Sequence, residues 1–322
     1  MSIYSEFFRK LSVITLFVLA VVCVGCTKSN DSDEPNVPVD DTPLTGTLEF
    51  SDRSPSDVLA GHTNLTGLKG LKFSGQVDDS GWDDVPKVPS LKVLKLDNTR
   101  VGDNAMNKIV EYFPNIEELT LTKTQISDDG LVVLANLQKL KKIRISKTSI
   151  TNSAIELLVN MVSLEDIDVS ETVVSDVALL VNLPNLKRLN LYLTSISDDS
   201  RVSLSELKNI EWLNLDGTKI TDDTLGFLTK LKKLTWLHLG RTSIHDAGLQ
   251  SIAKIKTLKT LYITRTAVTR EGVVTLAGEL PECKIIDDVR GVGDINDNND
   301  NEEPITETPE EPQASAEQTE TK

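Results

Sequence analysis

Residues 210–220 read IEWLNLDGTKI, and residues 234–244, which begin 24 positions later, read LTWLHLGRTSI. Leucine or isoleucine fills the first, fourth, sixth and last positions of both stretches, and threonine fills the ninth. Apolar residues that alternate with other residues around the fourth and sixth positions indicate a short strand with one buried face. The two stretches therefore predict one structural unit that is repeated after 24 residues.

This pattern recurs in register nine times between residues 68 and 268, and successive copies start 22 to 25 residues apart. One such unit is too small to bury its own leucines, whereas stacked units share a continuous core. The regular spacing therefore predicts a solenoid. The copies begin at Leu68, Leu91, Ile116, Leu140, Leu164, Leu186, Ile210, Leu234 and Leu258.

Many copies continue with signals that start a helix. Ser127, Ser197 and Thr221 are each followed by two aspartates and then by spaced leucines. A hydroxyl side chain can cap a helix, and acidic residues in the first turn interact favourably with the helix dipole. Each unit is therefore predicted to be a strand, a turn and a short helix. The aspartate pairs are interpreted as helix caps rather than as paired catalytic carboxylates.

The unit L-x-x-L-x-L-x-x-T-x-I resembles the repeat of the leucine-rich-repeat (LRR) superfamily, and in particular the helix-bearing repeats of F-box-associated and bacterial surface proteins. The resemblance covers residues 68–268. It implies an α/β solenoid, a right-handed superhelix or horseshoe with a parallel concave β-sheet and short convex helices. Threonine stands where the superfamily usually has asparagine or cysteine, and its hydroxyl is expected to bond the backbone of the turn.

The LRR domain is predicted to span residues 44–290, with clear repeats over 68–282 and a capping unit at each end. The first cap is read from Leu48 to Leu59, and the last strand is expected at Ile285 and Ile286, after a helix over 271–280. Cys283 stands at a leucine position. A buried, inert thiol is expected there, and a reactive thiol is the alternative.

Residues 1–26 are similar to a bacterial lipoprotein signal peptide. A positively charged start precedes an apolar run over residues 11–24, which is shorter than the roughly 20 residues of a comfortable membrane span. Residues 23–26 read CVGC and resemble a lipobox, with Cys26 as the lipidated residue. Thr27 rather than aspartate after that cysteine favours the outer membrane or cell surface. An ordinary cleaved signal and an uncleaved anchor are the alternatives.

The net charge of −15 is concentrated in two acidic segments. Residues 27–43 carry five acids and one lysine, and residues 291–322 carry ten acids and one lysine, which gives −4 and −9. Neither segment has an apolar period, so both are expected to be disordered, the first as a linker and the second as a tail. Because a nucleic-acid partner requires a basic surface, no nucleic-acid partner is expected.

The concave surface is predicted to carry a ligand-binding patch in repeats 186–268. Aromatic and arginine side chains are enriched at binding hot spots, and they gather here in a chain with 4% aromatic residues. We expect the two tryptophans to be exposed. In the alternative interpretation, their rings pack against neighbouring strand side chains and stiffen the sheet. The predicted patch is Arg188, Tyr192, Trp212, Trp236, His238, Arg241, Tyr262 and Arg265.

The preceding repeats place charged residues on the same surface, with basic side chains on one predicted strand and Asp166 and Asp168 on the next. Opposite charges on adjacent strands are expected to neutralise one another, and an electrostatic docking site is the alternative. No metal site and no cofactor are expected, because the chain has three histidines and, outside the leader, one cysteine.

The sequence favours a non-catalytic binding protein. It contains no G-x-S-x-G, H-E-x-x-H or phosphate-cradling glycine loop. His238 near Asp216 could form an acid–base pair, but without a nucleophile it is interpreted as part of a contact surface. We expect a lipid-tethered protein of the bacterial envelope that recognises a protein ligand, with a peptide or a glycan as the alternative ligand. The alternative is a structural scaffold that uses its repeats for assembly or cell-wall association.

Overall fold

The computed structural model of the protein describes residues 43–289. The predicted signal segment with Cys26, the linker up to residue 42 and the acidic tail from residue 291 lie outside the described residues. None of the helices within residues 43–289 combines the length and the apolar character that a membrane span requires. The same residues contain no cluster of three or more His, Cys, Asp or Glu side chains placed to hold a metal ion.

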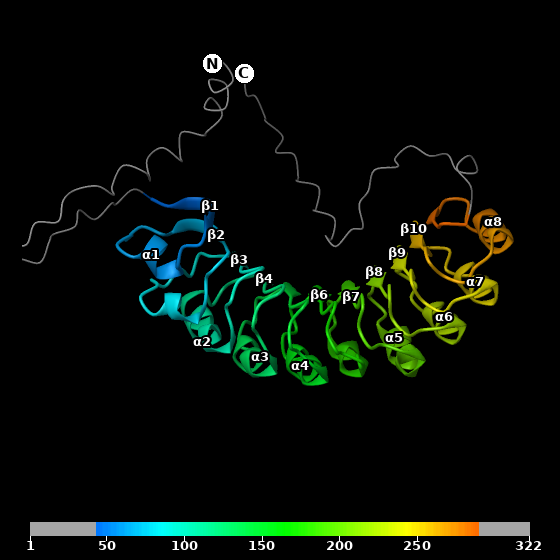
Figure 1. Ribbon diagram of the computed structural model, residues 1–322, viewed down its shortest axis with the longest axis horizontal. Helices are drawn as coiled ribbons and strands as arrows, with labels where there is room; N and C mark the ends of the chain where they lie inside the picture. The colour runs from blue at the N-terminus through cyan, green and yellow to red at the C-terminus, as the bar shows by residue number, and fades with distance from the viewer. Residues whose placement is uncertain (1–42, 290–322) are drawn as a thin grey trace, which may run out of the picture. The chain divides into compact units, whose positions relative to one another are not determined.

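Eleven parallel strands form one sheet in which each strand pairs with its neighbours in chain order. The strands lie along the inner side of a curved array and the helices along its outer side (Figure 1). The predicted LRR solenoid is therefore confirmed. The strands are β1 (Thr45–Ser51), β2 (Gly67–Ser74), β3 (Val93–Lys95), β4 (Glu118–Thr120), β5 (Lys142–Arg144), β6 (Asp166–Asp168), β7 (Arg188–Asn190), β8 (Trp212–Asn214), β9 (Trp236–His238), β10 (Thr260–Tyr262) and β11 (Lys284–Ile286).

The central leucine of each unit pairs with the same position in the next unit, which aligns every repeat. Leu213 faces Leu189 on one side and Leu237 on the other, and all three side chains are fully buried. Because the register does not slip between β2 and β11, the leucines of successive units form one continuous core. The residues between the leucines are left on the concave surface.

Short helical segments return the chain to the next strand. Most begin after a Ser or Thr side chain that caps them, as Thr221 does by accepting the N–H of Asp223. The segments are α1 (Pro55–Leu59), η1 (Asp79–Trp82), α2 (Asp103–Tyr112), α3 (Asp128–Leu134), α4 (Asn152–Leu158), η2 (Ala178–Asn182), η3 (Asp198–Ser200), α5 (Arg201–Glu206), α6 (Asp222–Leu228), α7 (Asp246–Ile252) and α8 (Arg270–Glu279).

The unit that starts at Leu164 departs from the predicted strand–helix pattern. It is 22 residues long, the shortest of the nine repeats, and it lacks the hydroxyl–aspartate–aspartate signal. The 3₁₀ segment η2 replaces the α-helix, because a 3₁₀-helix rises further per residue and can close a shorter connection.

The turn after each strand uses a left-handed backbone residue directly before the threonine position. Gly217 has φ of 69° there, and Thr218 donates its hydroxyl proton to the Leu215 carbonyl at 2.6 Å, as expected from the sequence. Ten units share the positive φ, although eight of the ten residues are not glycine: Asp52, Gly75, Asn98, Lys123, Lys147, Glu171, Leu193, Gly217, Arg241 and Arg265.

Both ends of the array carry an extra unit. At the start, β1 and α1 pack against the first repeat, and Trp82 of η1 lies fully buried between the Phe73 and Phe113 rings. At the other end, α8 precedes β11, which pairs with β10. Cys283 is only partly buried, and burial raises the pKa of its thiol to about 11, so the thiol is protonated at neutral pH.

Candidate functional site

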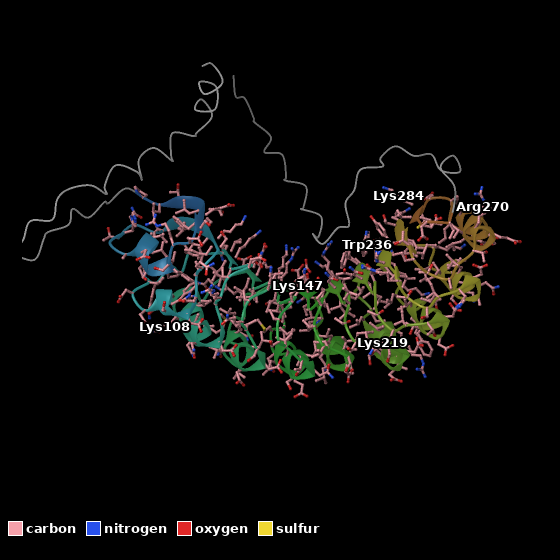
Figure 2. All side chains as sticks on the ribbon, viewed as in Figure 1. Lys108, Lys147, Lys219, Trp236, Arg270 and Lys284 are labelled. Atoms are coloured by element: carbon pink, nitrogen blue, oxygen red, sulfur yellow. The ribbon has the colours of Figure 1, made fainter. Side chains whose placement is uncertain are left out.

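Four neighbouring strands, β7 to β10, bring five of the eight predicted site residues together. Parallel pairing aligns Arg188, Trp212 and Trp236 in one row, and it aligns His238 with Tyr262 in the next row. The other three, which are Tyr192, Arg241 and Arg265, occupy the turns after β7, β9 and β10. Figure 2 shows Trp236 on the strand side of the array. These eight residues are called the aromatic–arginine patch below.

Four rings of the patch form a continuous stack across β8, β9 and β10. The Trp212 and Trp236 centroids are 4.1 Å apart with 11° between the ring planes. Trp236 lies 5.4 Å from Tyr262, and His238 lies 4.7 Å from Tyr262. Parallel strands about 4.8 Å apart place like side chains at stacking distance, so the repeat itself produces the ladder.

Trp212 is buried, so the expectation that both tryptophans are exposed is wrong for this residue. Only 8% of Trp212 is accessible, whereas Trp236, His238 and Tyr262 are half-buried. Trp236 covers one side of the Trp212 ring, and the Arg188 guanidinium carbon lies 4.8 Å from its centroid. The sequence could not distinguish the two tryptophans, because they occupy the same position in adjacent repeats.

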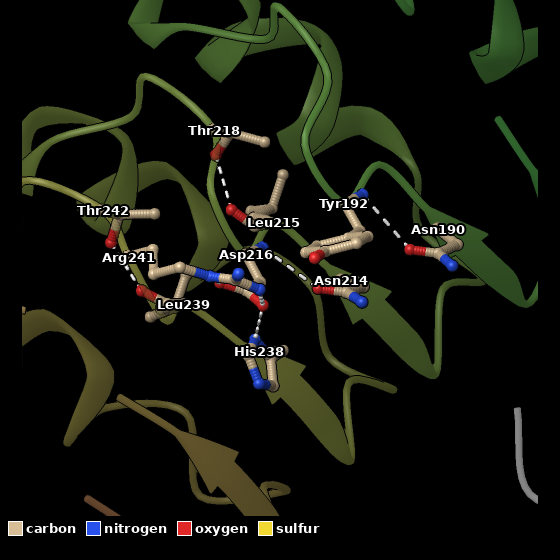
Figure 3. Close-up of polar contacts among 10 residues, drawn as sticks. All are labelled: Asn190, Tyr192, Asn214, Leu215, Asp216, Thr218, His238, Leu239, Arg241 and Thr242. Carbon is tan, nitrogen blue, oxygen red and sulfur yellow. Dashed lines mark hydrogen bonds and ion pairs between the residues drawn. The ribbon is translucent and has the colours of Figure 1, made fainter. Parts of the chain in front are cut away.

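A buried carboxylate organises one side of the patch (Figure 3). Asp216 Oδ1 accepts a hydrogen bond from Arg241 Nε at 2.8 Å, and Asp216 Oδ2 pairs with Arg241 Nη2. The Arg241 guanidinium carbon also lies 4.9 Å from the Tyr192 ring centroid. Asp216 therefore holds Arg241 against Tyr192, a positioning role that the position of Asp216 within the repeat does not indicate.

His238 is electrically neutral at physiological pH. Its Nδ1 lies 3.4 Å from Asp216 Oδ2, but it has no well-aligned hydrogen bond within the described residues. Burial lowers the pKa of His238 to about 4, and nearby Arg241 adds to this effect while Asp216 opposes it. The ring therefore contributes to the stack as an uncharged side chain.

Buried asparagines beneath the patch fix the turns that carry its side chains. Asn190 Oδ1 accepts the N–H of Tyr192 at 3.2 Å, and Asn214 Oδ1 accepts the N–H of Asp216 at 3.0 Å. Both asparagines are 8% exposed and occupy the same position in adjacent strands. Their period of 24 residues is visible in the sequence and could have identified them as turn-positioning residues.

The concave surface of the earlier repeats is charged but balanced. Its ion pairs include Lys142 with Glu118 at 3.5 Å and Lys147 with Glu171 at 3.1 Å. Burial raises the pKa of both Asp166 and Asp168. From β3 to the turn after β6, five bases and five acids sum to zero: Lys95, Lys123, Lys142, Arg144 and Lys147 against Asp97, Glu118, Asp166, Asp168 and Glu171.

The surface from β7 to the turn after β10 is different, since three bases stand against one acid. Arg188, Arg241 and Arg265 outnumber Asp216, and with neutral His238 the sum is +2. This part of the concave surface is therefore locally basic in a chain whose net charge is −15.

Comparisons with known proteins place the fold. A family model described as FBD-associated F-box protein At5g56370, LRR repeats, matches residues 62–213. No curated protein sequence matches the chain.

Among solved structures, internalin C2 from Listeria monocytogenes aligns with a TM-score of 0.51 and 20% identity, over 73% of this chain and 91% of that one. Internalin inlF of the same organism aligns with a TM-score of 0.49 and 18% identity, over 77% of this chain and 87% of that one. The LRR ectodomain of the receptor kinase GASSHO1/SCHENGEN3 from Arabidopsis thaliana aligns with a TM-score of 0.49 and 17% identity, over 76% of this chain and 29% of that one. With its repeat pattern, parallel sheet and family match together, the chain belongs to the leucine-rich-repeat superfamily.

Proposed function

We propose that the protein is a non-catalytic binding protein that captures a protein ligand on its aromatic–arginine patch. The observation that carries the proposal is the four-ring stack, because it places partly accessible aromatic surface beside arginines on one side of the sheet. Such side chains give a large contact area at a modest entropic cost. Curved solenoids also present an extended concave surface that suits a macromolecular partner.

The second element of the proposal is a lipid tether at the bacterial envelope, with the outer membrane or cell surface favoured. It rests on the sequence of residues 1–26, in which a positive start, an apolar run and the CVGC motif precede the linker. Cells that express the full chain should incorporate labelled palmitate, and Cys26→Ser should abolish the incorporation. Labelling that persists in Cys26→Ser would contradict lipidation at this residue.

Ligand capture from envelope extracts tests the binding proposal. Trp236→Ala should lower the amount of captured ligand at least tenfold, because Trp236 offers the half-exposed surface of the stack. The matched control is Phe227→Ala, since Phe227 of α6 also lies near two cations, Arg201 and Lys230, but belongs to a helix on the outer side. Equal losses in the two variants would count against the patch.

A scaffold function is the second candidate, and exposed aliphatic side chains favour it. Six of the eight large hydrophobic residues that stand out as exposed lie between residues 162 and 202. Exposed apolar surface of this kind can mark a contact between molecules. If the protein assembles through these units, Val173→Asp should shift its mass in solution towards the monomer, whereas Trp236→Ala should not.

A further inference from the structure

Two neighbouring hydrogen-bond donors of the patch are buried without an acceptor among residues 43–289. They are Trp212 Nε1 and Arg188 Nη2. Trp212 as a whole is 8% exposed, and the Arg188 guanidinium lies against its ring. Buried donors nearly always have a partner, since an unpaired one loses its hydration without compensation. The pair therefore marks a place where an acceptor from another molecule could complete the hydrogen bonding once the Arg188 side chain moves.

The chemistry of the two donors specifies that acceptor. An indole N–H and a guanidinium N–H can only donate, so the missing group must supply lone pairs. Asp166 Oδ2 already engages Arg188 Nε at 3.3 Å and leaves the outer guanidinium nitrogens for a ligand. The Arg188 side chain keeps 30% of its surface exposed, so it can pivot about this contact, away from the Trp212 ring that it lies against, and make both donors accessible. A carboxylate is the strongest partner for such a donor pair.

The surrounding charge also favours an anionic group. The strands and turns from β7 to β10 sum to +2, whereas those from β3 to β6 sum to zero. Arg265, at the edge of the patch, has no ion-pair partner within residues 43–289. A ligand with carboxylates is therefore attracted to the patch and not to the earlier repeats.

The ring stack defines what lies next to the carboxylate. Trp236 and Tyr262 are half-buried and follow Trp212 along the sheet, one and two strands away, which is roughly 5–10 Å. In an extended peptide, side chains on one face are about 7 Å apart, which is two residues. A carboxylate at the Arg188–Trp212 donors thus places an apolar side chain of the same peptide over Trp236 and Tyr262.

We propose that the aromatic–arginine patch binds an extended acidic peptide of a partner protein. One carboxylate of the peptide accepts hydrogen bonds from Arg188 Nη2 and Trp212 Nε1, and an aromatic or aliphatic side chain two residues away covers Trp236 and Tyr262. This inference rests on the proposed function and adds the chemical class of the ligand. Arg188 supplies the specificity and the exposed rings supply the contact area.

The test uses the full chain and three labelled peptides of eight residues, measured by fluorescence anisotropy. One peptide alternates Glu with Phe, the second replaces every Glu by Gln, and the third replaces every Phe by Ser. The protein should bind the Glu–Phe peptide at least tenfold more tightly than either of the others. Arg188→Gln should remove the preference for Glu over Gln, and Trp236→Ala should weaken binding of both Phe peptides.

Two further variants separate the role of the guanidinium group from that of its positive charge. Arg188→Lys retains the positive charge beside Asp166, and thus the fold, but loses the planar fork, so it should lose most of the Glu preference. Lys147→Gln is the matched control because it removes a positive charge from the same surface outside the patch, and it should change each affinity less than twofold.

The outcomes separate this inference from the proposed function. If Trp236→Ala weakens binding but the Glu and Gln peptides bind equally, the carboxylate assignment is overturned and the proposed function stands. If Trp236→Ala changes neither peptide binding nor ligand capture, both are overturned. Oligogalacturonate is a carboxylated glycan, and binding of this glycan alone, dependent on Trp236, would overturn the peptide assignment.

Discussion

Asp128 holds the next repeat through both oxygens of its carboxylate. Its Oδ1 accepts the backbone N–H of Thr151 at 2.9 Å, and its Oδ2 accepts the Thr151 hydroxyl at 2.6 Å. The same arrangement joins Asp103 to Ser127 and Asp246 to Thr269. The aspartate at the first position of these helices therefore connects neighbouring units, in addition to its place in the first turn of its own helix.

Replacement of Asp128 should weaken the contact between two repeats. We expect Asp128→Ala to lower the free energy of unfolding by about 1–3 kcal/mol, because it leaves the Thr151 N–H and hydroxyl without their acceptor. In a repeat array, stability depends on the interfaces between neighbours, so the loss should also reduce cooperativity. Urea denaturation followed by circular dichroism measures both effects.

The chain offers two matched controls for this prediction. Asp129→Ala removes the neighbouring exposed acid, whose carboxylate forms no hydrogen bond or ion pair with the next repeat within residues 43–289, and it should change stability by less than about 0.5 kcal/mol. Asp128→Asn should be milder than alanine, since Asn152 occupies this position in the next unit and its Oδ1 accepts the Ser175 N–H at 2.8 Å. A loss from Asp129→Ala as large as that from Asp128→Ala would contradict the connecting role.

The leucine period predicted the fold because burial alone determines it. Every leucine position of the pattern lies in the core, and the strands fall where apolar residues alternate. The sequence pattern identifies the aspartate pairs only as caps of their own helices and does not reveal the link to the next repeat. A cap is a local pattern, whereas the partner of Asp128 is 23 residues away and becomes a neighbour only after the units stack.

The left-handed turn residue before each threonine makes a second stability prediction. Lys123 has φ of 57°, is exposed, and has no ion-pair partner within residues 43–289. Lys123→Val should lower the free energy of unfolding by about 1–2 kcal/mol, because a β-branched side chain is strained at positive φ. Lys123→Gly should change the free energy of unfolding by less than about 1 kcal/mol. Glycine adopts a positive φ without strain, and this gain offsets the greater conformational freedom of glycine in the unfolded chain.

Thermal and chemical denaturation of the Lys123 variants should be compared with Lys219→Val. Lys219 is also exposed, but its backbone is extended and bridges to Ser197, so a β-branched residue is tolerated there. If Lys219→Val is as destabilising as Lys123→Val, the turn conformation is not the cause.

The repeat pattern predicted where the eight residues lie on the solenoid but not how deeply each of them is buried. Position within the repeat was enough to place all eight residues on the strand side and in the turns that follow. It could not show that Trp212 lies beneath Trp236 and Arg188, or that Asp216 ties Arg241 to Tyr192. Those relations depend on side-chain rotamers and on burial, which a period of 24 residues does not encode.

The two tryptophans should respond differently to truncation. Trp212→Ala removes a buried ring and should lower the free energy of unfolding by about 3–5 kcal/mol. Trp236→Ala removes a half-buried ring and should cost about 1–2 kcal/mol. Denaturation curves of the single variants measure the difference. Equal losses of unfolding free energy would show that Trp212 is not the more deeply buried ring of the stack. Trp236→Ala is therefore the better probe of binding, because it perturbs the fold less.

His238 should make the protein less stable as the pH falls from 7 to 4. Burial lowers the pKa of the folded ring to about 4 from an ordinary value of 6.5. Between these values the unfolded chain binds a proton that the folded chain does not, so stability rises with pH. The contribution of His238 to the free energy of unfolding is fully present above about pH 6.5 and is lost progressively as the pH falls to about 4. It can reach about 3 kcal/mol.

The variant His238→Phe isolates this effect, because it keeps a ring beside Tyr262 and removes the titrating group. The difference in unfolding free energy between wild type and His238→Phe should change in favour of the variant as the pH falls from 7 to 4. Asp166 and Asp168, whose pKa values burial raises, act in the opposite direction but equally in both proteins, so the comparison cancels them. A difference that stays constant over this range would show that the ring is not held neutral by its burial in the stack.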